Sequence, residues 1–311
     1  MNRRRLLQLA CTSTLGAALA PPLQLPAHAG RSKRSATPAR APRGETEGTW
    51  TELWNGQDFS GWQPRLAPAE PPASPGRGGT EDPQVFSVVE DTPRKGSPRT
   101  LLRISGERFG ALVSEAVYQN YRLRVEWRWG EAKWAPRIHL RRSSGLVVHS
   151  QLDLTPFGPQ KPWASGLELD LQEGSCGDLW VGRGLKVDVP SRRERFMGTP
   201  LYVYAGGHPP ETLPLPESDP RVVKSSDYER TFGDWNVSEA LVVGSEVAFL
   251  TNGALTLSLA RARRTDAAEE TPVTSGALQL LSEGAELFVR RVALRPLEDM
   301  PARFRVRGSA R

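Results

Sequence analysis

The chain has 311 residues, of which 38% are hydrophobic and 7% aromatic, so it is neither a disordered nor a collagen-like protein. Its net charge of +6 comes from residues 1–47, which hold eight basic and two acidic side chains, and the rest of the chain is neutral overall. A neutral body gives no reason to expect a nucleic-acid partner. Only Cys11 and Cys176 are present, which excludes a disulfide scaffold and a cysteine-based zinc site.

The first 29 residues have the organisation of an export signal peptide. Three arginines at positions 3–5 precede an apolar run from Leu6 to Ala20, and Ala27-His28-Ala29 offers a cleavage site. Paired arginines followed by two leucines resemble a twin-arginine signal. The apolar run is too short and interrupted to span a bilayer. We therefore expect a protein exported to the periplasm or cell envelope, without a stable membrane span.

Residues 30–47 follow as a basic segment rich in Pro and Ala. Such a composition buries too little apolar surface to offset the entropy of ordering, which predicts a disordered linker. The last residues, 298–311, are expected to form a similar loose tail. Residues 48–297 lie between these segments and are expected to form the folded domain.

Hydrophobicity in this body alternates with a period of two, which is typical of half-buried antiparallel strands. In Tyr121–Trp129, one face is Tyr, Leu, Val, Trp and Trp, while the other is Arg, Arg, Glu and Arg. Asn252-Gly253 is the preferred pair for a two-residue type I′ hairpin turn. Many short strands with Gly- and Pro-rich turns predict an all-β sandwich. In chain order, strands are expected near 85–90, 100–105, 110–114, 121–129, 137–141, 145–151, 167–172, 185–189, 201–205, 246–251, 254–259, 276–281 and 286–294.

The usual motifs of nucleotide binding, zinc proteolysis and serine hydrolysis are absent from the sequence, which leaves carboxylates, histidines and tryptophans. On a regular strand, Glu168, Asp170 and Gln172 project to one face above the apolar residues between them. Glu173 would join them only if a bulge re-aimed it. This acidic face is either a catalytic surface or an ordinary solvated one.

His149 lies on the apolar strand 145–151, where a lone histidine is either a catalytic partner or a satisfied core group. Several tryptophans lie beside turn signals, where an indole can either stack on a sugar or pack in the core. They are Trp54, Trp62, Trp163, Trp180 and Trp235.

Stretches across residues 50–297 resemble the 3-keto-disaccharide hydrolase family. They are 50–62, 86–91, 110–114 with 118–128, 144–149, 168–174 with 177–180, 233–239 with Asn252-Gly253, and 282–286. The resemblance implies a jelly-roll β-sandwich of the concanavalin A-like type. Members of the family often have Asn where Ser143 stands and Gln where Asp170 stands.

The resemblance implies cleavage of glycosides already oxidised at carbon 3. A base removes the proton at C2, which the ketone acidifies, the C1 oxygen leaves, and water adds to the product. We expect Glu168 to be the base, with His149 as its partner, Asp170 as an orienting group and Glu173 as a further catalytic candidate. Gln172, Trp163, Trp180 and Asp178 are the candidate substrate-binding residues.

The sequence gives no evidence of a cofactor, although a divalent cation could hold the enediolate charge. The resemblance implies that a separate 3-oxidising dehydrogenase supplies the substrate, and the absence of a nucleotide fingerprint from this chain fits that expectation.

Two alternatives remain open at this stage. The run Glu168-x-Asp170-x-x-Glu173 also resembles the signature of glycoside hydrolase family 16, a family of retaining endoglycanases. The same sandwich could also be a non-catalytic carbohydrate-binding module, since a fold does not fix a function.

Overall fold

A computed structural model describes residues 48–68, 84–91, 99–154, 163–196, 199–214, 220–266 and 268–307. The predicted signal peptide and linker, residues 1–47, lie outside the described residues. The described part contains nineteen strands and one short 3₁₀ helix, and no helix in it is long and apolar enough to cross a membrane. The predicted all-β class is confirmed.

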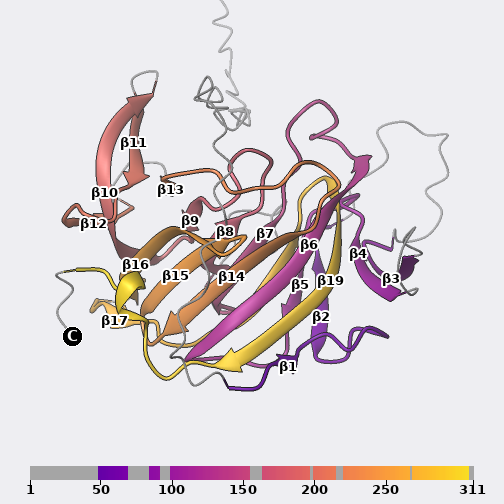
Figure 1. The fold of residues 1–311 in the computed structure, drawn as a ribbon, viewed down its shortest axis with the longest axis horizontal. Coiled ribbons are helices and arrows are strands. Elements are labelled where there is room, and N and C mark those ends of the chain that lie inside the picture. The colour runs from indigo at the N-terminus through magenta and orange to yellow at the C-terminus, as the bar shows by residue number, and fades with distance from the viewer. Residues whose placement is uncertain are drawn as a thin grey trace, which may run out of the picture. The chain divides into compact units, whose positions relative to one another are not determined.

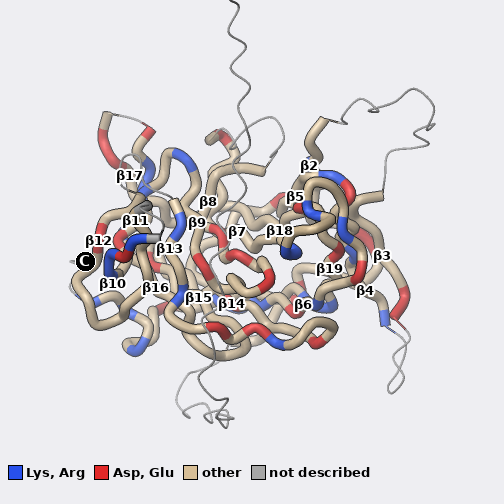
Figure 2. Tube along the Cα trace, turned by 90° about the horizontal axis from the view of Figure 1, so that it is seen from above, with Lys and Arg blue, Asp and Glu red and all other residues tan. Residues whose placement is uncertain are grey.

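The strands form two face-to-face layers (Figures 1 and 2), which we call sheet A and sheet B. Sheet A contains β1 (Thr51–Glu52), β3 (Phe86–Asp91), β4 (Arg99–Ile104), β6 (Tyr121–Lys133), β14 (Asn236–Val243), β15 (Glu246–Thr251), β16 (Ala254–Arg264) and β19 (Ala285–Pro296). Its central strands run in the order β4-β19-β6-β14-β15-β16.

Sheet B runs in the order β2-β5-β18-β7-β8-β9-β13-β11-β10. Its strands are β2 (Trp62–Leu66), β5 (Gly110–Ser114), β7 (Gly145–Gln151), β8 (Ser165–Asp170), β9 (Leu179–Val181), β10 (Leu185–Phe196), β11 (Thr199–Tyr204), β13 (Arg221–Val223) and β18 (Ala277–Ser282). Two short strands lie at one side of the sandwich: β12 (Pro210–Leu213) pairs with β10, and β17 (Thr271–Pro272) pairs with β16. Strands β10 and β16 also pair with each other and so connect the two sheets.

The chain passes repeatedly between the two sheets, for example from β5 in sheet B to β6 in sheet A and back to β7. All the strand pairings described are antiparallel except that of β11 with β13. This arrangement is the predicted jelly-roll sandwich of the concanavalin A-like type. Figure 1 shows β6, β14 and β19 crossing in front of β5, β7 and β8.

The core between the sheets follows from the alternation in the sequence. Leu123, Val125 and Trp127 of β6 are fully buried and share one cluster with Leu167 and Leu169 of β8. The charged residues between them point outward, as predicted for strands with one solvated face. The Asn252-Gly253 turn has positive φ at both residues, as a type I′ hairpin requires, and that prediction is confirmed.

Two predictions of local structure are wrong. Residues 137–141 are not a strand, because Arg137 and Leu140 close successive tight turns through backbone hydrogen bonds. The described part of the expected loose tail is docked: Phe304, in the 3₁₀ helix η1 (Ala302–Phe304), packs with Met300 on Leu241 and Leu250 of sheet A. The carboxyl-terminal segment is polar overall, but its apolar residues Met300 and Phe304 make this contact with sheet A. All other predicted strand segments overlap an observed strand.

Candidate functional site

Glu168 occupies the middle of the outer face of sheet B. It pairs across the sheet with Val147 of β7 and Trp180 of β9, so the three side chains share one face. Glu168 is half-buried, while its neighbours Leu167 and Leu169 face the core. The predicted orientation of Glu168 away from the core is therefore confirmed. The same cross-strand row contains Gln63, Val113, Gln279, Val147, Glu168, Trp180 and Arg221.

Gly145, on the neighbouring strand β7, makes room for the Glu168 carboxylate. A Cβ at position 145 would stand 2.4 Å from Glu168 Oε1 and 2.8 Å from a methyl carbon of Leu281. Real Cβ atoms do not approach other atoms so closely. The absence of a side chain at Gly145 therefore fixes where the carboxylate can lie.

Asp170 lies two residues along the same strand, but it is buried and accepts three hydrogen bonds. Its donors are the Gln172 backbone N–H at 2.8 Å, the Ser175 hydroxyl at 3.1 Å and the Trp180 indole N–H at 3.4 Å. Burial, and then the neighbouring charge of Asp178, raise the pKa of Asp170 to about 6. Asp170 therefore orders the turn after β8 and holds the Trp180 indole.

Asp178 lies completely inside the fold. Its carboxylate accepts from Arg221 Nε at 2.8 Å and from the Lys224 backbone N–H at 3.0 Å. The Arg221 side chain is also buried, and its guanidinium lies 5.8 Å from the centre of the Trp180 ring. Asp178 is predicted from the sequence to bind substrate. In the structure, its hydrogen bonds connect β13 to the turn that precedes β9.

Strand β8 ends at Asp170, so Gln172 and Glu173 lie in the turn that follows and not on the continuing strand that the alternation predicted. Gln172 accepts from Arg137 at 3.0 Å and donates to Ser175 at 2.8 Å. The Glu173 carboxylate accepts from the Arg142 backbone N–H at 2.9 Å and from its guanidinium at 2.8 Å. Glu173 is therefore held at the rim by Arg142.

His149 is turned away from Glu168. The pairing of β7 shifts register around it and its φ is +52°, which are the marks of a bulge. Its Nε2 lies 3.0 Å from the Gly244 carbonyl oxygen, in the β14–β15 turn of sheet A. The side chain is fully buried, and burial lowers the pKa of His149 to about 4. His149, the predicted partner of Glu168, therefore does not lie next to it, because the bulge directs the imidazole ring between the sheets.

The two predicted tryptophans differ in their surroundings. Trp163 is only 2% exposed and packs with Phe109, Val113 and Val147 in an apolar cluster on the outer face of sheet B. Trp180 is half-buried and lies directly beside Glu168. Of the two indoles, Trp180 is the one that is partly exposed and adjacent to Glu168.

Sequence reasoning missed the residues that come from distant loops. Glu283, in the turn between β18 and β19, accepts from the Ser143 hydroxyl at 2.8 Å and lies 3.9 Å from Arg137. Its charge also contributes to the raised pKa of Asp170, so these groups lie near one another. No local motif links positions 137, 143 and 283. The pairings of β18 with β7 and of β19 with β6 bring them together.

Chemically, this face offers one half-buried carboxylate beside an indole, backed by a buried network of carboxylates and guanidinium groups. Among the described residues, no group of three or more His, Cys, Asp and Glu side chains is placed to hold a metal ion. The Glu168 carboxylate can accept a proton, and the neighbouring Trp180 indole is held by its hydrogen bond to Asp170.

Comparisons with solved structures give similarities at low identity. A candidate glycosyl hydrolase from Parabacteroides distasonis is 18% identical, with 81% of this chain and 94% of that one covered and a TM-score of 0.43. A protein of unknown function with a galectin-like fold from Bacillus subtilis is 9% identical, with coverage of 81% and 99% and a TM-score of 0.41. A carbohydrate-binding module from the same species is 9% identical, with coverage of 68% and 95% and a TM-score of 0.34. We draw nothing about function from similarities at this level.

No curated protein matches the chain significantly in sequence. A family model described as the 3-keto-alpha-glucoside-1,2-lyase-like domain matches residues 49–295, which are most of the chain and contain both sheets. The resemblance found in the sequence is thus confirmed, and the chain belongs to the 3-keto-alpha-glucoside-1,2-lyase-like domain family.

Proposed function

We propose that this protein cleaves glycosides oxidised at carbon 3, with Glu168 as the general base. The observation that carries the proposal is the half-buried Glu168 carboxylate on the outer face of sheet B, within the domain that the family model matches. Its placement above Gly145 and beside Trp180 gives it one defined position next to a surface that can hold a sugar ring.

The reaction proceeds in two stages and involves no net oxidation. The Glu168 carboxylate takes the proton from C2, and the electron pair of that C–H bond forms an enediolate with the C3 ketone. The enediolate then collapses, the bond between C1 and the glycosidic oxygen breaks, and that oxygen leaves with a proton. Water adds across the C1–C2 double bond, placing hydroxyl on C1 and hydrogen on C2, so the sum is hydrolysis of the glycoside.

A carboxylate can act as the base only because the C3 ketone stabilises the negative charge that develops. Without the ketone, the C2 proton is far too weakly acidic. Glu168 becomes protonated in the first stage and can hand that proton to the leaving oxygen, so we assign it the role of a proton shuttle as well. We assign no proton transfer to His149, because its ring contacts Gly244 between the sheets.

Asp170 acts as a positioning residue. It accepts the Trp180 indole N–H and the Ser175 hydroxyl, and Ser175 in turn accepts from Gln172. These contacts hold the indole and the Gln172 amide at the end of the strand that carries Glu168. A sugar ring over Trp180 would then have its polar edge beside Gln172.

The structure gives less support to a retaining endoglycanase. Such an enzyme needs two carboxyl groups about 5–5.5 Å apart, facing the same glycosidic bond. The second carboxylate of that signature is Glu173, which lies beyond the end of β8 and is bound by Arg142 through two hydrogen bonds. We therefore propose the elimination mechanism, which uses one carboxylate at the reacting carbon.

The test compares a 3-keto-glucoside with the unoxidised glucoside as substrates. We expect wild type to release sugar from the oxidised substrate alone, and Glu168→Gln to lose about 10²–10⁴-fold in rate because it removes the base and keeps the shape. The matched control is Glu194→Gln, an exposed carboxylate on β10 that pairs with Arg192. Cleavage of the unoxidised substrate would favour the endoglycanase, and sugar binding without turnover would favour a binding module.

A further inference from the structure

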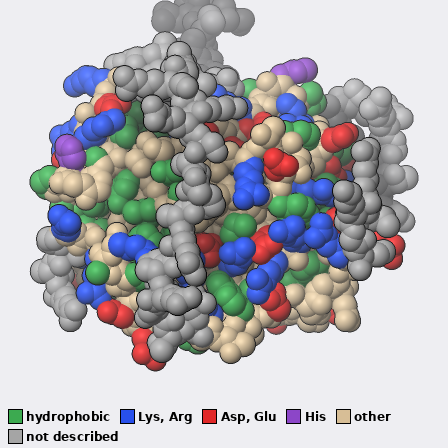
Figure 3. Space-filling view, viewed as in Figure 1, with side chains coloured by type: hydrophobic (Ala, Val, Ile, Leu, Met, Phe, Trp, Pro, Cys, Tyr) green, Lys and Arg blue, Asp and Glu red, His purple; other side chains and the backbone are tan. Residues whose placement is uncertain are grey.

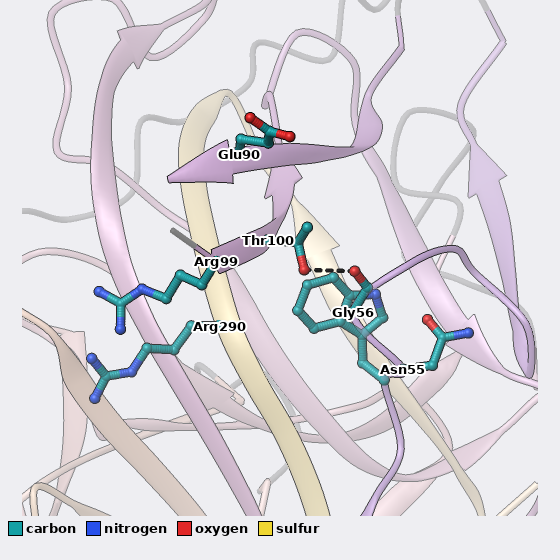
Figure 4. Close-up of a pocket in the computed structure, with 7 residues that line it drawn as sticks. Asn55, Gly56, Glu90, Arg99, Thr100 and Arg290 are labelled. Carbon is teal, nitrogen blue, oxygen red and sulfur yellow. Dashed lines mark hydrogen bonds between the residues drawn. The ribbon is translucent and has the colours of Figure 1, made fainter. Parts of the chain in front are cut away.

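The outer face of sheet A, on the opposite side of the sandwich from Glu168, carries a second set of aromatic and charged side chains. Trp235, just before β14, lies beneath three guanidinium groups: Arg290 at 4.4 Å, Arg128 at 4.9 Å and Arg99 at 5.3 Å from the ring centre. Arg99 and Arg290 also line an open hollow of about 540 Å³ (Figure 4). The hollow is completed by Trp54, Asn55, Gly56, Glu90 and Thr100.

The guanidinium groups around Trp235 are only partly neutralised. Arg99 and Arg128 share the Asp91 carboxylate, and Arg124, Arg290 and Arg291 share the Glu126 carboxylate. Arg124 also lies 3.8 Å from Glu239, so five cations meet three anions. Glu90 also lines the hollow and adds one further negative charge. The cluster therefore keeps a net positive charge of about one, localised at an indole.

Arg99 donates to the Asp91 carboxylate through Nε alone, at 3.1 Å, and Arg290 donates to the Glu126 carboxylate through Nε alone, at 2.7 Å. Among the described residues, no acceptor takes a hydrogen bond from the terminal nitrogens of either side chain. Figure 4 shows the two guanidinium groups projecting in the same direction, away from Asn55 and Thr100. Two guanidinium groups with open terminal nitrogens are suited to binding a carboxylate through paired hydrogen bonds.

A second indole lies beside guanidinium groups further along β19, but there Arg295 is buried and Arg291 donates to Glu52 from Nε and a terminal nitrogen. The Trp50 ring has Arg295 at 5.0 Å and Arg291 at 5.6 Å from its centre. A bulge at Val289–Arg291 lets both Arg290 and Arg291 reach Glu126 on the outer face. The six residues from Arg290 to Arg295 span about 16 Å of strand, so the two indoles lie in separate places on this face. Figure 3 shows basic side chains gathered over β6 and β19, with acidic ones among them.

We propose that this face of sheet A, with Trp235, Arg99 and Arg290 at its centre, binds an acidic polysaccharide. The guanidinium groups of Arg99 and Arg290, stacked over the Trp235 ring, present their terminal nitrogens to the carboxylates of the sugar units. The exposed large hydrophobic side chains of the described residues do not include any that line the hollow, so nothing there is placed to enter a lipid bilayer. Two guanidinium groups with open terminal nitrogens are fewer than the phosphate contacts that a nucleic-acid-binding surface makes, which does not favour a nucleic acid.

Binding of the full chain to polygalacturonate tests the proposal, with dextran, oligo(dT) and anionic phosphatidylglycerol vesicles as the comparison ligands. We expect binding to polygalacturonate that weakens as salt rises, and little binding to the others. The double variant Arg99→Gln/Arg290→Gln should bind at least about tenfold more weakly. The matched control is Arg192→Gln/Arg193→Gln on β10, whose side chains are 55% and 58% exposed and pair with Glu194 and Glu211.

Equal binding to dextran, preference for oligo(dT) or vesicles, absence of binding to polygalacturonate, or unchanged binding by the Arg99/Arg290 variant would each overturn the proposal. Thermal unfolding confirms that both double variants are folded. Turnover of a small 3-keto-glucoside, measured on the same samples, should be unchanged in both. Because that turnover depends on Glu168 and not on this face, failure of one proposal would not imply failure of the other.

Discussion

The Glu168 carboxylate lies directly over Gly145, so that a Cβ at residue 145 would stand 2.4 Å from Glu168 Oε1. Gly145→Ala should therefore displace the carboxylate while leaving its chemistry intact. Displacement of a reacting group by about 1 Å can cost about 100-fold in rate, and we expect a fall in kcat of that order. Steady-state kinetics on a 3-keto-glucoside measures it.

Gly207→Ala is the matched control, because a Cβ at that position meets nothing within 4 Å. This variant should keep wild-type kinetics. Equal kinetics for folded Gly145→Ala and wild type would show that the position of Glu168 does not matter for turnover.

His149 should make stability depend on pH without taking part in turnover. Burial lowers its pKa to about 4 from an ordinary value of 6.5, so the unfolded chain binds the proton more readily. The stabilisation is fully present above about pH 6.5 and is lost as the pH falls towards 4, by up to about 3 kcal/mol. Urea unfolding at a series of pH values measures this loss.

His149→Asn tests this prediction, because asparagine tolerates the positive φ of +52° at this position. The variant should lose stability less steeply between pH 6.5 and 4, and it should retain turnover at neutral pH. His139→Asn, at an exposed position, is the control and should leave the slope unchanged. Loss of turnover in folded His149→Asn would instead support the catalytic role that the sequence suggested.

The ion pair of Asp178 with Arg221 should contribute more to stability than any exposed pair. Both side chains are buried, so Asp178→Asn removes the negative charge that lies against a buried guanidinium. Removing one partner of a buried pair costs about 3–5 kcal/mol. Asp266→Asn, in a more exposed pair with Arg264, should change stability little. Chemical denaturation measures the free energy of unfolding of both variants. An equal decrease in Asp178→Asn and Asp266→Asn would contradict the prediction.

The docked carboxyl-terminal segment gives a further stability prediction. Phe304 is 9% exposed and packs with Met300 on Leu241 and Leu250. Phe304→Ala should lower the free energy of unfolding by about 2–4 kcal/mol. Phe232→Ala, at a ring that is 48% exposed, is the control. An unchanged melting temperature for Phe304→Ala would mean that the segment is the loose tail its composition suggested.

The sequence was sufficient to predict the sandwich, because the alternation in Tyr121–Trp129 directly reports one buried and one solvated face. The same rule placed Glu168 on the outer face of its strand. It failed for Gln172 and Glu173, because the strand ends at Asp170 when the chain turns to Asp178. Strand ends depend on hydrogen bonds to distant segments, which alternation does not reveal.

The position of His149 could not be predicted either, because a bulge shifts the alternation by one residue and has no strong sequence signal. Glu283 and Arg221 escaped notice for a different reason. Each reaches the site only through strand pairings between segments more than 40 residues apart in the chain. Carboxylates and arginines are common, so neither residue stands out before the fold is known.

The most direct test of the central claim follows deuterium in the released sugar. Wild type acting on a 3-keto-glucoside in deuterated water should yield a 3-keto sugar that carries deuterium at C2, because elimination and hydration replace that hydrogen. Incubating the free 3-keto sugar with Glu168→Gln protein measures the background exchange. Deuterium at C2 above this background, together with loss of turnover in Glu168→Gln, is the predicted result. Release of sugar from the unoxidised glucoside with no deuterium at C2 would contradict it.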